Sequence, residues 1–140
     1  MFIPQKFEDP MFGQMKLIDD ETSYHGRVFF APLNQQIEIN VLSKSCGPTK
    51  DQHTLFRQIE DRYFDWIENL PPCIEKNYPF RKGPLTVLDF TKNFELIAIR
   101  IPEYDDNKKS WGVEYTTDGL DGWIEIQFIN WMPSNFSFEQ

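Results

Sequence analysis

The histidines and cysteines are the side chains of this sequence best suited to metal binding or nucleophilic catalysis, and there are two of each. His25 lies beside Gly26 at the start of an expected strand, whereas His53 falls in the first turn of an expected helix. Zinc sites draw on closely spaced ligand pairs, and neither histidine has a second ligand at such spacing. Cys46 and Cys73 are likewise isolated. We predict no metal site, although a Cys–His pair assembled by folding is left open.

Carboxylates are the most abundant groups that could act as acids or bases, with 22 Asp and Glu residues and a formal net charge of −8. Two of them could form the pair used by a hydrolase. In so acidic a chain, however, close pairs arise by chance, so we expect binding rather than catalysis. The glycines form neither G-x-G-x-x-G nor a phosphate-binding loop, so we predict no cofactor. A chain with this negative charge repels nucleic acid and anionic membranes and favours basic protein partners.

The segment from residue 110 to 140 has the most distinctive charge pattern, because it contains acids but no Lys, Arg or His. Its acids are Glu114, Asp118, Asp121, Glu125 and Glu139, and its aromatic residues are Trp111, Tyr115, Trp123, Phe128, Trp131, Phe136 and Phe138. Aromatic anchors beside unpaired carboxylates suit a surface that binds a basic protein. Alternatively, the rings form core and the acids a solvated face. Alternation favours the core for Ile124, Ile126 and Phe128, and places Trp123, Glu125 and Gln127 on the other face.

The elements that must position these residues are strands and one long helix. Apolar and alternating runs predict strands over residues 24–30, 37–41, 85–90, 94–101, 111–115 and 123–128. Thr49 and Gln52 form a capping box, which predicts a helix over Asp51–Leu70 that ends at Pro71-Pro72. Its apolar stripe comprises Leu55, Phe56, Ile59, Tyr63, Trp66, Ile67 and Leu70, with Phe64 outside it. We predict an α+β fold, a single antiparallel sheet meander with one long helix packed across it, in one domain over residues 1–140.

The compartment is inferred from the N-terminus and from the length of the apolar runs. Residues 1–6 lack the basic and apolar regions of a signal peptide, and no apolar run approaches the roughly 20 residues that cross a bilayer. We therefore expect a cytoplasmic protein that does not insert into membranes. In that reducing compartment Cys46 and Cys73 are expected to be free thiols.

Three short motifs in the first half carry a family resemblance. They are Phe12-Gly13 before a short strand, the aromatic-x-Gly of Tyr24-His25-Gly26, and Pro48-Thr49-x-x-Gln52 at the start of a helix. Over roughly residues 7–70 the chain resembles a family of small bacterial proteins, many of them immunity proteins of polymorphic toxin systems, including contact-dependent growth inhibition. The second half departs from that family: residues 118–123 stand where its members have a late Trp followed by an acidic-His-Gly turn. The resemblance implies a toxin-neutralising protein, and no binding residue is transferred from it.

The resemblance and the acidity together predict an immunity protein that binds and neutralises a cognate toxin, a basic protein such as a nuclease, without being an enzyme. A non-catalytic adaptor domain unrelated to toxin immunity is the main alternative, and a two-carboxylate hydrolase is a third. Oligomeric state is not predicted.

Turns at one end of a sheet can cluster in space, so the predicted partner-binding residues lie in and beside two of them. They are Tyr104, Asp105, Asp106, Asp118, Asp121 and Trp123. The competing surface is the outer face of the helix, with Glu60, Asp61, Asp65 and Glu68.

Overall fold

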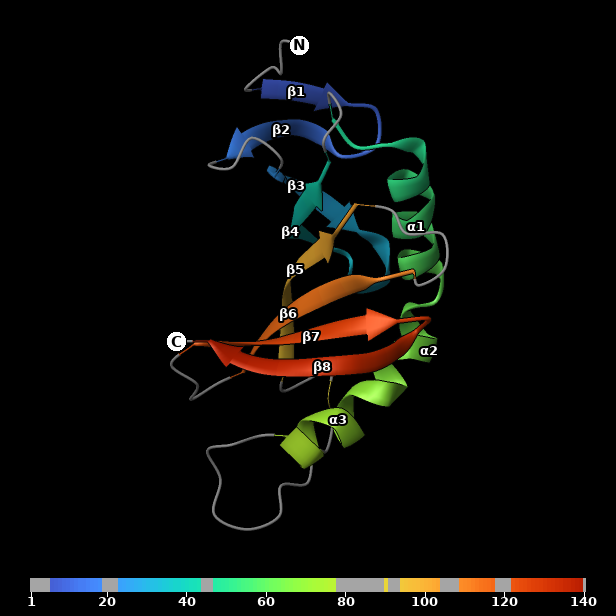
Figure 1. Ribbon diagram of the computed structural model, residues 1–140, viewed down its shortest axis with the longest axis vertical. Coiled ribbons are helices and arrows are strands. Elements are labelled where there is room, and N and C mark those ends of the chain that lie inside the picture. The colour runs from blue at the N-terminus through green and yellow to red at the C-terminus, as the bar shows by residue number, and fades with distance from the viewer. Residues whose placement is uncertain are drawn as a thin grey trace.

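The fold is α+β, with one eight-stranded sheet and its helices on one side (Figure 1). The computed structural model describes residues 6–18, 23–43, 47–77, 90, 94–103, 109–117 and 122–139. The strands are β1 (Lys6–Asp9), β2 (Gly13–Ile18), β3 (Ser23–Phe30), β4 (Gln35–Leu42), β5 (Phe94–Ile101), β6 (Trp111–Thr117), β7 (Trp123–Ile129) and β8 (Met132–Glu139). The helices are α1 (Lys50–Asp61), α2 (Tyr63–Trp66) and α3 (Leu70–Asn77), with short 3₁₀ turns η1 (Ala31–Leu33) and η2 (Ile67–Asn69). Between α3 and β5 only Phe90 is described, so the strand predicted over residues 85–90 otherwise lies outside the described residues.

The strands lie in the sheet in sequence order, as two antiparallel meanders joined side by side. β1–β4 form one meander and β5–β8 the other. The junction contradicts the prediction of a wholly antiparallel sheet, because β4 pairs with β5 in parallel, with Ile39 opposite Ile99. A parallel neighbour needs a crossover, and the helical segment between the two strands provides it. A single helical segment is enough for this one crossover, which the prediction of hairpins throughout did not consider.

The helical segment is not the single long helix that was predicted. α1 ends at Asp61, and Arg62 departs from helical geometry with φ −102° and ψ 14°. The indole Nε1 of Trp66 donates a hydrogen bond of 2.9 Å to the carbonyl oxygen of Ile59. That oxygen would otherwise accept from the amide of Tyr63, so the side chain replaces a backbone bond where the helix breaks.

Pro71 and Pro72 do not end the helix either, which is a second correction. They lie in the first turn of α3, which starts at Leu70. Proline is tolerated there because amides of the first turn have no partner within the helix. The prolines therefore begin a new helix after the short η2 turn, instead of stopping the first one.

The start of α1 is formed as predicted. The Gln52 amide donates to Thr49 Oγ1 over 3.2 Å, and the Thr49 amide donates to Gln52 Oε1 over 2.9 Å. Gln52 is also buried, and its Nε2 donates to the carbonyl oxygens of Leu42 and Pro102 at 2.6 and 3.0 Å. One side chain thus caps the helix and ties it to the ends of β4 and β5, the two parallel strands.

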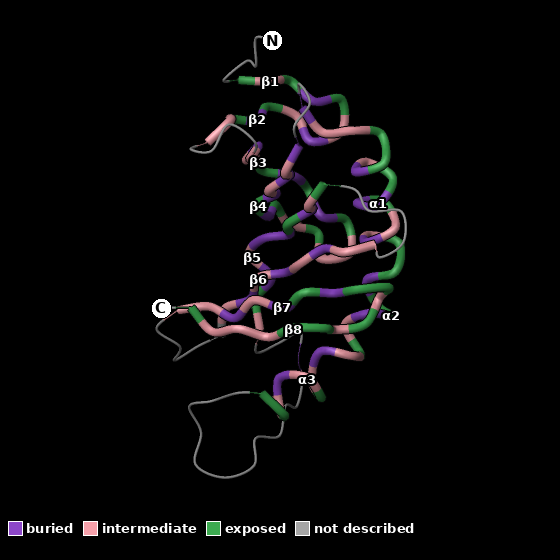
Figure 2. Tube along the Cα trace, in the orientation of Figure 1, coloured by how far each residue is buried: buried purple, intermediate pink, exposed green. Residues whose placement is uncertain are grey.

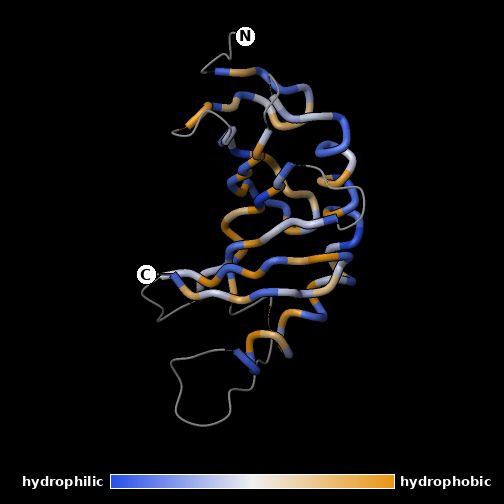
Figure 3. The backbone as a smooth tube through the Cα atoms, in the orientation of Figure 1, coloured by the Kyte–Doolittle hydropathy of each residue, from blue (hydrophilic) through white to orange (hydrophobic). Residues whose placement is uncertain are grey.

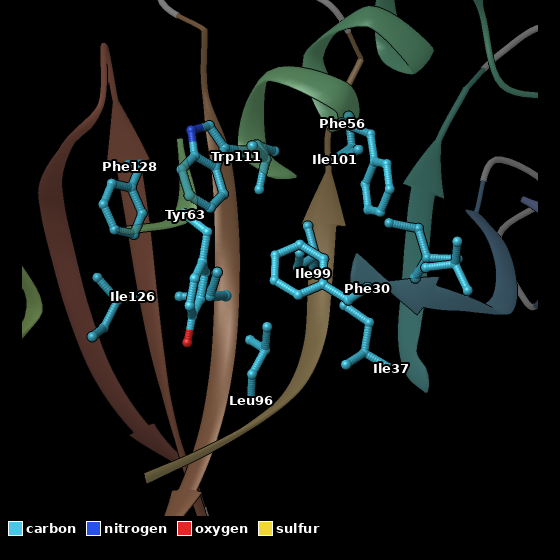
Figure 4. Packing of buried hydrophobic residues seen from close by; sticks show 14 of the residues in the cluster. Phe30, Ile37, Phe56, Tyr63, Leu96, Ile99, Ile101, Trp111, Ile126 and Phe128 are labelled. Atoms are coloured by element: carbon cyan, nitrogen blue, oxygen red, sulfur yellow. The ribbon is translucent and has the colours of Figure 1, made fainter. Parts of the chain in front are cut away.

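The core lies between the helices and one face of the sheet, and most of the predicted helix stripe is buried in it. The buried helix residues are Leu55, Phe56, Ile59, Tyr63, Trp66 and Leu70. Trp66 packs edge-on against Trp111 and Phe128, whose rings stack at 4.3 Å (Figure 4). Ile67, predicted to be buried, is only half-buried because it lies in the η2 turn after the helix break.

Ile97 and Ile99, in the strand predicted over residues 94–101, both belong to β5, in the middle of the sheet. Ile99 is fully buried, whereas Ile97 is half-buried. The reason is a β-bulge: Leu96 pairs with Tyr115 and Ala98 with Glu114, so Ile97 is an extra residue. The bulge shifts the alternation by one position, so that Leu96 and Ile99 both face the core.

Candidate functional site

The histidines and cysteines that could have supported metal or nucleophilic chemistry contact different neighbours in the structure. His25 Nε2 lies 2.9 Å from Ser23 Oγ on β3, and His53 Nε2 lies 2.9 Å from the buried Asp9 carboxylate. Burial raises the pKa of the Cys73 thiol, outweighing the hydrogen bond from Asn77 and the charge of Lys76, which disfavours the nucleophilic thiolate. Cys46 lies outside the described residues. Within the described part of the chain, no three His, Cys, Asp or Glu side chains form a group that could hold a metal ion.

Of the six predicted partner-binding residues, the structure describes Trp123. Tyr104, Asp105, Asp106, Asp118 and Asp121 lie outside the described residues. Trp123 begins β7 and is half-buried, and its Nε1 donates to Glu125 Oε1 over 3.4 Å. The predicted alternation of β7 is confirmed, because Ile124, Ile126 and Phe128 are buried in the core. Trp123 and Glu125 consequently lie on the opposite face of the sheet.

None of the described helices covers that opposite face (Figure 1). It carries the most unusual group of charges. The strand register places Glu38 of β4 beside Ala98 of β5, Ala98 beside Glu114 of β6, and Glu114 beside Glu125 of β7. Three carboxylates therefore share one row across four strands, and Arg27 of β3 lies beside Glu38 at one end of it. Like charges directly opposite one another on a sheet are destabilising, so the Glu114–Glu125 pair at the other end opposes folding stability unless something compensates it.

Protonation is one compensation within the row. Burial, a hydrogen bond with the Glu125 carboxyl and the negative charges of Glu125 and Glu38 together raise the pKa of Glu114 to about 7. The positive charge of Arg100, on the neighbouring strand β5, acts in the opposite direction. At neutral pH the Glu114 carboxyl is thus divided between its neutral and its charged form, and it would ionise fully if a cation approached.

Beside the carboxylates the sheet is hollowed where β6 has Gly112. The cavity has a volume of about 170 Å³, and its lining includes Arg100, Gly112, Glu114, Glu125 and Gln127. A Cβ on Gly112 would meet its nearest neighbours, the Ile126 carbonyl oxygen and Gln127 Cγ, only at 3.6 and 3.9 Å. A Cβ atom therefore fits there, and what glycine provides at this position is the empty space.

Cavity size and carboxyl separation indicate whether this group of residues suits binding or hydrolysis better. The carboxyls of retaining glycosidases stand about 5 Å apart or more, farther than a hydrogen-bonded pair such as Glu114 and Glu125. A pair sharing a proton does occur in aspartic proteases. Small-molecule sites, however, are typically about 300–1,000 Å³, well above the hollow beside this pair. The hollow better suits one side chain of a protein partner, and a basic side chain would match its carboxylates.

Comparison of the chain with protein families, with curated proteins and with solved structures found no match. Among the described residues, no helix is both long and apolar enough to cross a membrane.

The sequence analysis identified some residues of this face but did not predict that the carboxylates and the Gly112 hollow lie together. Alternation along residues 111–115 and 123–128 places Glu114 and Glu125 opposite core positions, and both belong to the acid-rich segment. Glu38, Arg100 and Gly112 were not singled out. The contribution of Glu38 depends on β4 lying beside β5, which no local pattern indicates. Arg100 and Gly112 join the group through the pairing of β5 with β6 and of β6 with β7.

Proposed function

We propose that this protein is an immunity protein, which neutralises a cognate toxin by binding a basic surface of it with the helix-free face of the sheet. The observation that carries the proposal is the pairing of Glu114 with Glu125 beside the Gly112 hollow. Two carboxyls held together on an accessible sheet face are stabilised when a cationic side chain replaces the proton between them. A lysine or arginine of the toxin provides that cation.

Neutralisation of this kind requires binding and no catalytic group of its own. The formal charge of −8 attracts a basic partner over long range and speeds association. Nuclease toxins offer basic substrate grooves, and a row of carboxylates can occupy such a groove in place of phosphates. The protein acts in the cytoplasm, where the toxin would reach its target, and it binds neither nucleic acid nor membranes. A non-catalytic adaptor that binds another basic protein is the alternative.

The proposal requires a toxin domain encoded beside this chain, and co-expression of the two tests it. We expect the chain to restore growth and to co-purify with the toxin domain in a stoichiometric complex. A toxin that stays lethal and does not co-purify would contradict immunity, and co-purification with another protein instead would favour the adaptor.

A double variant tests the binding face. Glu114→Gln/Glu125→Gln removes two carboxylates while preserving shape, and Asp65→Asn/Glu68→Gln removes two exposed ones from the helical side. At pH 8 we expect the first variant to bind the toxin at least tenfold more weakly and the second to bind within about twofold of the parent protein. The reverse order would move the binding face to the helices. As a separate probe of the hollow, Gly112→Val fills it and is expected to weaken binding without removing charge.

A further inference from the structure

The hairpin between β7 and β8 ends in an exposed apolar pair. Ile129 and Met132 lie directly opposite each other in the register, and their exposed fractions are 37% and 56%. Only four large hydrophobic residues are exposed in the described part of the chain, and Ile129 and Met132 are two of them. Figure 3 shows β7 ending in orange beside this turn, and Figure 2 shows β8 starting in green. Met132 also borders a groove of about 440 Å³ between β8 and α3.

The turn that presents this pair is held in an unfavourable backbone conformation. Asn130 and Trp131 both have positive φ, 48° and 69°, as a two-residue hairpin turn requires. Asparagine accepts such a conformation, but the second position strongly favours glycine, and a bulky residue there is an outlier. Such outliers persist where the surroundings hold them, and they are frequent at binding sites.

The ring of Trp131 explains how the turn is held. The guanidinium carbon of Arg62 lies 4.6 Å from the centre of this ring. The centre of the Trp111 ring, on β6, lies 5.8 Å from it. Arg62 is also the residue at which the helical segment breaks. The helix break and the hairpin turn therefore support each other, and Ile129 and Met132 are presented on a fixed turn.

The apolar pair is continuous with the carboxylate face. Glu125, Gln127 and Ile129 occupy alternate positions of β7, so all three lie on the helix-free side of the sheet. Glu125 and Gln127 border the Gly112 hollow, and Ile129 is the next residue on that face towards the turn. A protein that places a basic side chain in the hollow therefore reaches the Ile129–Met132 pair with the adjoining part of its surface.

We propose that Ile129 and Met132 are the apolar anchor for the toxin, which contacts them with an apolar patch next to the basic side chain that enters the hollow. This inference rests on the proposed immunity function and adds a second requirement to the partner surface. Acids mainly accelerate encounter, whereas buried apolar anchors mainly slow dissociation. A second copy of the chain is a poorer occupant, because two chains of charge −8 repel each other.

The test compares dissociation rates from the purified, catalytically inactivated toxin domain encoded beside this chain. Ile129→Ser/Met132→Ser removes the proposed anchor, and Phe64→Ser is the matched control. Phe64 has an exposed fraction of 65% but belongs to α2, on the other side of the sheet. We expect the double variant to dissociate at least tenfold faster with association within about twofold, and the control to be unchanged. Ile129→Thr keeps strand propensity and provides a milder variant if the double variant folds poorly.

The failures of the two proposals are distinguishable. A parent protein that does not bind the toxin removes the immunity function, and the anchor with it. A parent protein that binds, together with unchanged dissociation of the Ile129 and Met132 variants, overturns the anchor alone. Faster dissociation of the Phe64 variant instead would move the anchor to the helices. Sedimentation that finds the parent protein dimeric and the double variant monomeric would assign the apolar pair to self-association and also overturn the proposal.

Discussion

Glu114 and Glu125 lie directly opposite each other on β6 and β7, and their carboxyls are joined by a hydrogen bond. A carboxylic acid pair of this kind needs a proton or a cation between its oxygens. Because the Glu114 pKa is raised from its ordinary 4.5 to about 7, the pair is sensitive to pH near neutrality. Stability and toxin binding are both expected to depend on that proton.

The first prediction concerns the pH dependence of stability. Between pH 4.5 and 7 the folded protein holds a proton on Glu114 that the unfolded chain has released. The contribution of Glu114 is therefore fully present below pH 4.5 and is lost as the pH rises through 7. Glu114→Gln should be more stable than the parent protein at pH 8 but not at pH 4.5. Urea unfolding at both pH values measures this difference.

The exposed Glu95 of β5 provides the control for this experiment. Glu95→Gln should follow the parent protein at both pH values. A Glu114→Gln variant that also follows the parent protein throughout would show that the carboxyl titrates as an ordinary exposed glutamate.

The second prediction concerns Gln52, whose side chain joins α1 to the ends of both parallel strands. Gln52→Ala leaves the carbonyl oxygens of Leu42 and Pro102 without this donor and removes half of the capping box. We expect a loss of about 2–4 kcal/mol of unfolding free energy, measured by urea unfolding. Gln58→Ala, on the same helix, should change stability by less than about 0.5 kcal/mol. Equal effects of the two substitutions would mean that the crossover does not depend on this side chain.

The third prediction concerns the core under α1. Ile59 has no exposed surface, and its carbonyl also accepts the Trp66 indole. Ile59→Ala should destabilise the fold by about 2–5 kcal/mol through lost burial and a residual cavity. Arg57→Ala, at an exposed position two residues earlier, should leave the unfolding midpoint nearly unchanged. A small effect at Ile59 would show that the core collapses around the missing atoms.

The fourth prediction concerns Asp9, a buried carboxylate at the end of β1. It accepts hydrogen bonds from the amides of Met11 and Phe12 at 2.9 and 2.8 Å and also contacts His53. Asp9→Ala leaves three groups without their acceptor, whereas His53→Ala removes one of those groups and a ring contact with Phe12. We expect Asp9→Ala to destabilise the fold by about 3 kcal/mol and His53→Ala by roughly half as much. Comparable losses from both would assign the stabilisation to the Asp9–His53 contact alone.

The fifth prediction concerns the turns that the sequence analysis predicted to bind the partner. Charge reversal at Asp118 and Asp121 should slow association with a basic toxin, most strongly at low salt, because salt screens long-range attraction. Reversal at Asp65 and Glu68 serves as the matched set on the helical side. Stopped-flow association rates at two salt concentrations separate the sets. An unchanged rate for the turn variant, with a slower helix variant, would exclude the turns and leave immunity itself standing.

Local patterns in the sequence determined the strands β3–β7, the start of α1 and the buried faces of α1 and β7, whereas β1 and β8 were not predicted. Alternation along β7 identified its buried positions, and the apolar stripe of α1 identified Leu55, Phe56 and Ile59. The Thr49–Gln52 capping box located the start of the helix. These features depend on residues a few positions apart, since the repeat of a strand or helix and the geometry of a cap are local properties.

Only the tertiary structure decided which strands are neighbours and where the helix breaks. The parallel pairing of β4 with β5 joins residues far apart in the chain, and no short pattern specifies that choice. At the break beside Arg62 the Trp66 indole donates to the Ile59 carbonyl while its ring packs against Trp111 of β6, a contact between residues far apart in the chain. The same pairing brings Glu38 into line with Glu114 and Glu125. The acids are evident in the sequence, but the burial and the mutual repulsion that raise the pKa of Glu114 arise only when the sheet places them side by side.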